Sequence, residues 1–285
     1  MKIDSPVKPS YSTWVASQEP LNRVGELENS QGTYRTTLRT EGLRPPEAVF
    51  NERLDKTDLS AGDILLLVDQ PQNTNLTHQL IKLGQRLPAL SPLRRNNGDC
   101  ELVHAVMWSK RPNNAAKLDV NGAGESEIVE MRGGTKRSSS SSAVRQGLYK
   151  VYSPKDKNLG DWAAQVGQVW SVEGGIPYSK PHTILSIVRN SGFKTAAKAA
   201  SAQYASQAFE NRPRFPSKGS FCSHFVLAAY QAAAKNMGIE LTGALKVDAQ
   251  GTSVRTLEHF LKEDKQGFEF KGYLKIESKD ALYQE

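Results

Sequence analysis

Apolar residues follow no regular period over residues 1–45, whereas short apolar runs recur from residue 61 onward. Each run is bounded by glycine, proline or polar residues, which is the pattern of a buried strand. The pattern predicts strands over residues 61–68, 101–108, 127–131 and 147–152. The serine run Ser138–Ser142 has a composition that does not pack into a core, and we predict a loop there.

Helical spacing of apolar residues predicts a second set of elements. These helices cover residues 46–54, 77–87, 158–170 and 194–209. A further helix begins at Cys222, with Ser220 as its predicted N-cap and Gly238 as its stop. Gly174–Tyr178 is predicted as a turn. Strands mixed with helices in this way favour an α+β fold.

Composition divides the chain into two parts. Residues 1–45 are polar and contain Pro6, Pro9 and Pro20, so we predict a mobile leader, with residues 46–285 forming one domain. The chain lacks a secretory signal sequence or a long apolar segment. We therefore expect synthesis in a bacterial cytoplasm and take the leader as a candidate export signal for delivery into another cell. A cytoplasmic enzyme with an irregular N-terminus is the alternative.

The charge of the chain limits the classes of partner that we expect, and its cysteine content limits the expected role of the thiols. The chain has 37 Lys and Arg against 30 Asp and Glu, a net charge of +7, but these charges are scattered and form no long basic run. This argues against a nucleic-acid partner and allows only transient contact with an anionic membrane. The two cysteines, Cys100 and Cys222, are too few for a disulfide framework and fit a free catalytic thiol.

Cys222 and His104 are the candidate catalytic pair. A thiol at a helix N-terminus lies near unpaired backbone N–H groups and the positive end of the helix dipole, which favour the thiolate. His104 lies among apolar residues in a predicted strand, and an imidazole can act as the base for such a thiol. Taken singly, each residue is more often a buried structural group.

Metal binding is a weaker interpretation of the same residues. Cys100, His104, Cys222 and His224 have no recognised zinc-site spacing, so we expect neither a metal nor a cofactor. On a helix, His224 points about 200° away from Cys222, which makes it a poor direct base and favours a packing role.

The order of the short motifs resembles the circularly permuted papain-like families related to NlpC/P60, and most of all the YiiX-like branch. The motifs are Gly62-Asp63, His104, Val129-Glu130, Gly175-Ile176-Pro177-Tyr178 and Cys222-Ser223, and the resemblance spans residues 58–275. Cys222-Ser223-His224-Phe225-Val226 is also similar to the lecithin:retinol acyltransferase branch of that fold. The resemblance implies a small antiparallel sheet or barrel packed against helices.

The resemblance also implies roles for named residues. Cys222 would be the nucleophile, His104 the base, Glu130 the group that orients His104, and Tyr178 a residue lining the substrate cleft. Glu127 is the alternative third member, although period-two alternation puts it on the other face of its strand. The backbone N–H of Cys222 is the expected oxyanion donor.

The expected function is a cysteine-dependent amide hydrolase or peptidase that forms an acyl-enzyme on Cys222. The substrate would be a peptide, a peptidoglycan fragment or an acyl lipid. One alternative is an acyltransferase that passes the acyl group to a lysine or a lipid. The other is an interaction module whose thiol is inert.

Overall fold

The computed structural model describes part of the chain. Described residues are 53–69, 78–79, 81–82, 85, 99, 101–109, 127–131, 139–142, 144–173, 176–179, 183, 194–208 and 219–277. The chain divides into two units, residues 1–45 and residues 46–285, and every described residue belongs to the second. The leader predicted for residues 1–45 lies outside the described residues, as does Cys100.

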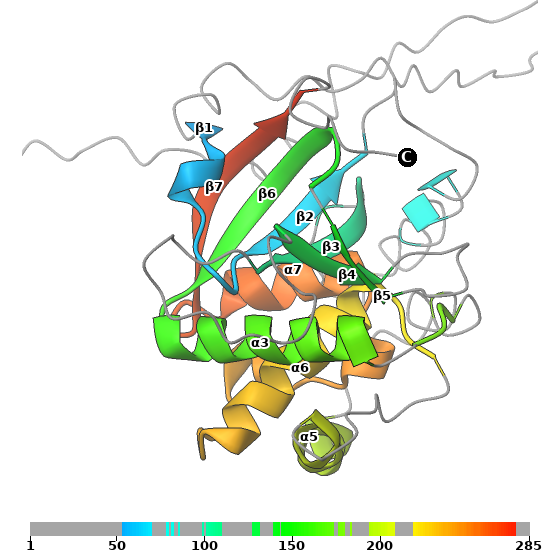
Figure 1. Ribbon diagram of the computed structural model, residues 1–285, viewed down its shortest axis with the longest axis vertical. Helices are drawn as coiled ribbons and strands as arrows, with labels where there is room; N and C mark the ends of the chain where they lie inside the picture. Colours follow the sequence, from blue (N-terminus) through cyan, green and yellow to red (C-terminus); the bar gives the residue numbers. More distant parts are fainter. Residues whose placement is uncertain are drawn as a thin grey trace, which may run out of the picture. The chain divides into compact units, whose positions relative to one another are not determined.

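The described strands form one seven-stranded sheet (Figure 1). They are β1 (Arg53–Leu54), β2 (Ile64–Val68), β3 (Leu102–Trp108), β4 (Ile128–Met131), β5 (Ser139–Ser142), β6 (Gly147–Pro154) and β7 (Phe268–Ile276). Their order is β1-β7-β6-β2-β3-β4-β5. Every neighbouring pair is antiparallel except β1 and β7, which are parallel, so the sheet is mixed.

Two predictions about local structure are wrong. Ser139–Ser142 is a strand, because its backbone pairs with β4 at the edge of the sheet, and backbone pairing at an edge needs no apolar side chain. Arg53–Leu54 is also a strand, paired with Tyr273 and Leu274 of β7, where the end of a helix was expected. The rest of that expected helix lies outside the described residues.

Four α-helices lie within the described residues: α3 (Lys157–Glu173), α5 (Lys194–Ala208), α6 (Cys222–Asn236) and α7 (Val254–Glu263). Single 3-10 turns occur at η2 (Lys56–Asp58), η4 (Gly243–Lys246) and η5 (Ala249–Gly251). Helices α3, α6 and α7 cover one face of the sheet, and α5 packs against α6 (Figure 1). The predicted strands, helices α3, α5 and α6, and the α+β class are confirmed. Of the helix predicted over residues 77–87, the described residues 78–79, 81–82 and 85 are helical. None of the described helices has the length and apolar character needed to cross a membrane.

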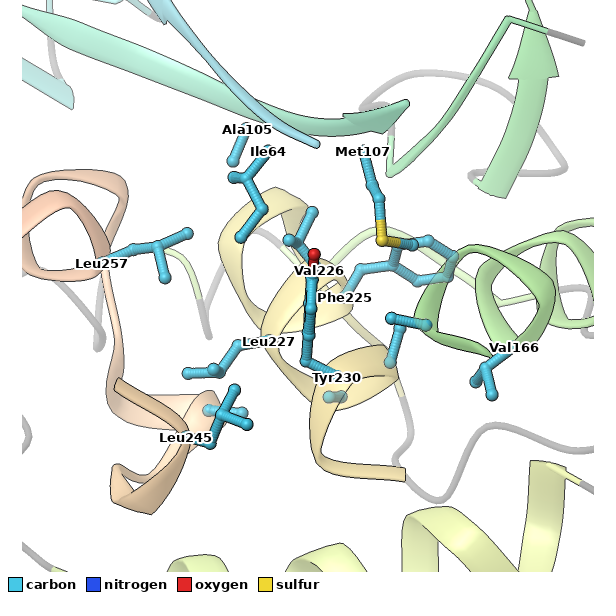
Figure 2. Packing of buried hydrophobic residues seen from close by; sticks show 14 of the residues in the cluster. Ile64, Ala105, Met107, Val166, Phe225, Val226, Leu227, Tyr230, Leu245 and Leu257 are labelled. Carbon is cyan, nitrogen blue, oxygen red and sulfur yellow. The ribbon is translucent and has the colours of Figure 1, made fainter. Parts of the chain in front are cut away.

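Helix α6 is the centre of the core. Every residue from Cys222 to Ala234 is buried, so the helix is enclosed on all sides rather than along one stripe. Figure 2 shows Phe225 and Val226 pointing toward Ile64 and Met107 of the sheet. A second apolar cluster contains alternate residues of the same strands, including Leu65, Val106 and Val151, on the sheet's other face.

The Gly62-Asp63 motif fixes the entry to β2. Gly62 has a φ of 89°, and a Cβ there would lie 2.4 Å from Cα of Gly160 at the start of α3. The Gly62 carbonyl accepts a hydrogen bond from the Tyr230 hydroxyl of α6. The fully buried Asp63 carboxylate accepts hydrogen bonds from Ser153 and Lys271. The motif therefore connects the sheet to α3 and α6 through close packing and a hydrogen bond.

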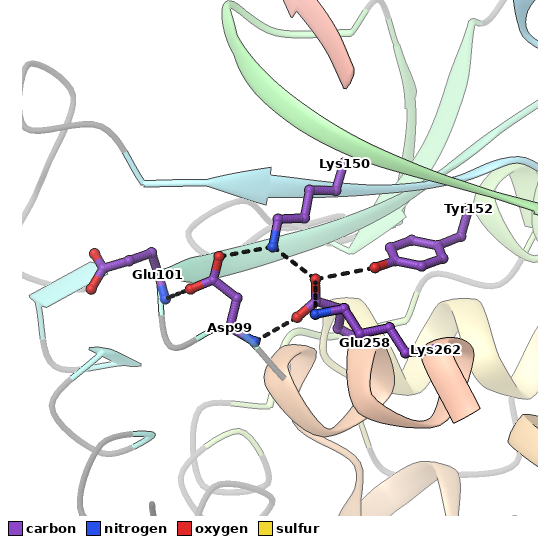
Figure 3. A network of polar contacts seen from close by, with 6 residues as sticks. All are labelled: Asp99, Glu101, Lys150, Tyr152, Glu258 and Lys262. Atoms are coloured by element: carbon purple, nitrogen blue, oxygen red, sulfur yellow. Dashed lines mark hydrogen bonds and ion pairs between the residues drawn. The ribbon is translucent and has the colours of Figure 1, made fainter. Parts of the chain in front are cut away.

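A buried charge network joins α7 to the sheet (Figure 3). Lys150 Nζ of β6 lies 2.8 Å from both Asp99 Oδ2 and Glu258 Oε1, and Glu258 also accepts hydrogen bonds from Tyr152 and Lys262. Lys150 and Glu258 are almost wholly buried. Because Asp99 precedes β3, the network links the start of that strand to β6 and α7.

Candidate active site

Cys222 is the first residue of α6 and is only 4% exposed. The N-cap is Phe221, without a side-chain cap, rather than the predicted Ser220. Ser220 forms a parallel bridge with Tyr178, and its hydroxyl lies 3.1 Å from Nδ1 of His224. The Ser220 side chain therefore contacts His224 and does not cap the N-terminus of α6.

A β-bulge sets the direction of His104. Leu67 of β2 pairs with His104 and Val68 pairs with Leu102, so Val103 is an extra residue in β3. Bulges re-aim the side chains that follow them. The side chain of Leu102 belongs to the core between the sheet and the helices. His104 lies two residues before Val106, and Val106 pairs with Glu130 of β4. His104 and Glu130 are thus diagonal neighbours on one face, within reach of each other.

His104 and Glu130 form a short hydrogen bond. Nε2 of His104 lies 2.6 Å from Oε2 of Glu130, whose side chain is 1% exposed. The other oxygen of this carboxylate, Oε1, lies 3.3 Å from Nη2 of Arg145. Tyr149 in turn donates a hydrogen bond to the Arg145 carbonyl, which anchors the loop that carries Arg145. Both oxygens of Glu130 are therefore held.

His104 also hydrogen-bonds Cys222, and the contact changes both pKa values. Burial lowers the pKa of His104, but the hydrogen bonds with Cys222 and Glu130 outweigh it and raise that pKa to about 10. Burial raises the pKa of Cys222, but the hydrogen bond and positive charge of His104 outweigh it and hold that pKa below its ordinary value. The contact therefore favours the ion pair of thiolate and imidazolium over the neutral pair.

Two backbone amides support the thiolate as well. The amides of Ala105 in β3 and Ser223 in α6 donate hydrogen bonds to Cys222, and both lower its pKa. Among the described residues, β4 pairs with Val106–Trp108 of β3, and Ala105 lies just outside that pairing.

Glu127, the alternative third residue, is engaged elsewhere. Both of its carboxylate oxygens lie within 3.1 Å of Lys56 Nζ, and Oε2 also accepts a hydrogen bond from the Val144 amide. The structure therefore brings together Cys222, His104 and Glu130 and leaves Glu127 with Lys56.

Tyr178 is close enough to Cys222 for the charge of the thiolate to act on its hydroxyl, and its proposed place in the lining of the substrate cleft stays a prediction. Its backbone is fixed by the bridge to Ser220, and its hydroxyl accepts a hydrogen bond from Thr183 at 3.4 Å. Burial raises the pKa of Tyr178, and the negative charge of Cys222 raises it further. The hydroxyl consequently keeps its proton across the neutral range and can act as a hydrogen-bond donor near the sulfur.

His224 belongs to the interior. Its Nε2 lies 3.0 Å from the Tyr204 hydroxyl, and its ring packs beside Phe221. It is fully buried on the side of α6 that faces α5. This location agrees with the packing role predicted from helical periodicity.

A narrow cleft opens beside the sulfur. Its volume is about 10 Å³, about the space of one water molecule, so it gives access to the sulfur without forming a large substrate pocket. The lining residues, besides Cys222, are Ile81, Gln85, Val103, Thr183, Phe221, Ser223, Ser253 and Val254. None of these described residues is charged, so the cleft suits an apolar or neutral group next to the attacked bond.

Comparison with known proteins finds no counterpart. Neither a protein-family model, nor a curated protein, nor a solved structure matches this chain. Among the described residues, no group of three or more His, Cys, Asp or Glu side chains is arranged to hold a metal ion. The prediction that the protein uses neither metal nor cofactor stays a prediction.

The sequence did not point to Arg145 or to the backbone amide of Ala105. Arg145 lies after a serine-rich segment that was expected to be a loop, and its link to Glu130 depends on the pairing of β5 with β4. The Val103 bulge also has no local signal in the apolar run 101–108. The alternation of side chains along the strand about Glu130 was the one sequence signal that indicated which face of the sheet Glu130 shares with His104.

Proposed function

We propose that this protein is a cysteine-dependent acyl hydrolase, acting on amide or ester bonds, with a circularly permuted papain-like fold. The observation that carries the proposal is the hydrogen-bonded series Cys222–His104–Glu130, in which the sulfur begins a buried helix. The same motif order, from a histidine strand through a glutamate strand to a cysteine helix, supports the proposed fold.

The geometry supports a two-step reaction. The thiolate of Cys222 attacks the substrate carbonyl carbon, and the negative oxygen that forms is stabilised by first-turn N–H groups of α6 and the Tyr178 hydroxyl. Protonated His104 gives its proton to the leaving amine or alkoxide as the carbon–heteroatom bond breaks, which leaves a thioester on Cys222.

Neutral His104 then takes a proton from water as the water oxygen attacks the thioester carbonyl. The carbon–sulfur bond breaks, the acid product leaves, and the imidazolium and thiolate are restored. Glu130 stays ionised throughout and holds the imidazole in the required orientation.

An acyltransferase is the second candidate, and the cleft favours it. The described residues that line the cleft are uncharged, and such a surface favours an apolar acyl group over an acidic peptide next to the sulfur. In that reaction a lysine amine or lipid hydroxyl replaces water in the second step. The chemistry of the first step is unchanged.

The test is formation of the acyl-enzyme. Wild type, Cys222→Ala and Cys100→Ala are incubated with p-nitrophenyl butyrate, and intact mass and peptide mass are followed. We expect one butyryl group on the Cys222 peptide in wild type and C100A, and none in C222A. Absence of both an adduct and a Cys222-dependent release of p-nitrophenol, or an equal adduct in C222A, would support an inert module instead. Adding a lysine derivative then separates transfer from hydrolysis by the product formed.

A further inference from the structure

A second hollow lies beside the C-terminal half of α7, where β6 ends and β7 begins. Its volume is about 260 Å³, and its floor is formed by the buried side chains of Tyr152, Leu261 and Phe268. It shares no lining residue with the Cys222 cleft. The two hollows lie at opposite ends of α7, since Val254 lines the cleft and Leu261, about 10 Å further along the helix, lines this pocket.

Three lysines surround the pocket: Lys155, Lys262 and Lys265. Lys262 is paired with Glu258 at 3.1 Å. Lys155 donates a hydrogen bond to the Lys265 carbonyl, and both side chains are exposed. Within the part of the chain that the structure describes, neither Lys155 nor Lys265 forms an ion pair with a carboxylate. Two positive charges therefore remain at the mouth of the pocket.

The nearby carboxylates leave this charge largely in place. Glu258 is already shared between Lys150 and Lys262 (Figure 3). Both carboxylate oxygens of Asp264 accept hydrogen bonds from backbone amides, those of Ala244 and Gly267. Glu269, which is exposed, is the one acidic residue among the described residues that line the pocket.

An exposed aromatic ring borders the same pocket. Phe270 is 40% exposed and is the one large apolar side chain that is exposed among the described residues. Its ring centroid lies 5.4 Å from that of Tyr152 and 5.2 Å from that of Tyr273. These two contacts hold Phe270 in place, so an apolar surface stands next to two lysines.

We propose that this pocket binds a phosphomonoester group attached to an apolar moiety. Lysine ammonium groups bind phosphate oxygens as point charges, so Lys155 and Lys265 would contact the phosphate. Phe270 would pack against the apolar part. A soluble phosphate ester and the headgroup of a phosphatidic acid membrane present this same chemistry. The site is separate from the proposed thiol chemistry and does not depend on it.

The test uses the full chain and two probes, phenyl phosphate and phosphatidylcholine vesicles containing phosphatidic acid. The pocket variant is Lys155→Gln with Lys265→Gln, and the matched control is Lys235→Gln with Lys246→Gln, two exposed lysines away from the pocket. Thermal melting and the rate of Cys222 alkylation confirm that each variant is folded. K265Q alone is the substitute should the double variant fail that check.

We expect the pocket variant to bind at least about tenfold more weakly than the control, because two charges next to the phosphate are lost. Weaker binding of phenyl phosphate assigns the site to a soluble ester, and weaker binding of vesicles alone assigns it to a lipid. Phe270→Ser should weaken vesicle binding further. Equal binding by both lysine variants, or no binding of either probe by wild type, overturns the proposal.

Discussion

Nη2 of Arg145 lies 3.3 Å from Oε1 of Glu130, the carboxylate oxygen that His104 does not use. The imidazole and the guanidinium therefore hold this carboxylate from two sides, and its rotation would break one of the two contacts. Arg145 does not contact the sulfur in this arrangement. Its expected effect on the reaction is through the position of Glu130, and hence of His104.

Arg145→Met should slow acylation of Cys222 by about tenfold, because Glu130 loses one of its two fixed contacts. The free energy of unfolding should change by about 1 kcal/mol or less, since the Arg145 side chain is 34% exposed. Arg145→Lys should recover part of the rate. Stopped-flow acylation and urea unfolding measure the two effects, and a stability loss that accounts for the whole rate loss would refute a positioning role.

Tyr178→Phe should reduce acylation by about 100-fold if the hydroxyl stabilises the oxyanion. Alkylation of Cys222 by iodoacetamide forms no oxyanion and should change little, so the ratio of the two rates isolates the hydroxyl. Thr183→Val, which keeps the Tyr178 hydroxyl but removes the hydrogen bonds that Thr183 donates to this hydroxyl and to the Ser179 carbonyl, shows how much of the effect comes from the surroundings of Tyr178. Equal losses in both reactions would mean that Tyr178 acts on the thiol itself.

Local patterns predicted most of the strands and helices because those elements carry their own apolar signal. β5 escaped prediction because an edge strand of serines is specified by its partner β4 and not by its composition. β7 and α7 were not predicted either, although α7 begins with a side-chain cap in which Ser253 accepts a hydrogen bond from the Thr256 amide. Strand order and the parallel pairing of β1 depend on contacts between distant residues.

The candidate site was predicted from motif order, and the structure adds the contacts that order cannot provide. The sequence left Glu127 and Glu130 as alternatives, and only the position of Lys56, 71 residues away from Glu127, accounts for the Glu127 carboxylate. Ser220 was expected to cap α6 by residue type alone. Its pairing with Tyr178 and His224 is a tertiary effect.

Gly62→Ala should destabilise the fold by about 3 kcal/mol or more, because the new Cβ would collide with the backbone of Gly160. Gly238→Ala is the control, since Gly238 also has a positive φ, of 70°, but a Cβ there meets nothing within 4 Å. That control should cost only about 1 kcal/mol from backbone strain. Denaturant unfolding measures the free energy of unfolding of both variants. Equal decreases would show that the close approach of Gly62 to Gly160 does not contribute to stability.

Glu258 should make the fold sensitive to acid. Burial raises its pKa, but Lys150 and Lys262 outweigh burial and lower that pKa from 4.5 to about 2. Because the pKa is lower in the folded state, the stabilisation is present above pH 4.5 and is lost as pH falls toward 2. Wild type should therefore lose stability across this range.

Glu258→Gln should lose on the order of 3 kcal/mol at neutral pH, because the buried Lys150 ammonium loses the carboxylate that lies 2.8 Å from it. It should also show a flatter acid dependence than wild type. Glu263→Gln, an exposed carboxylate on the same helix, should behave as wild type. Urea unfolding at several pH values distinguishes these cases, and identical curves for both variants would contradict this assignment.

The paired thiolate and imidazolium are the centre of this account, and the pH dependence of Cys222 alkylation tests them most directly. Iodoacetamide modification is followed on the Cys222 peptide in wild type and His104→Ala, with the Cys100 peptide as an internal reference. In wild type, rapid alkylation should begin well below the ordinary thiol pKa of 9.0, because His104 stays charged up to about pH 10. In H104A the midpoint should move up to 9.0 or above, since burial then acts without the opposing charge. Superimposable profiles for the two proteins would contradict the account.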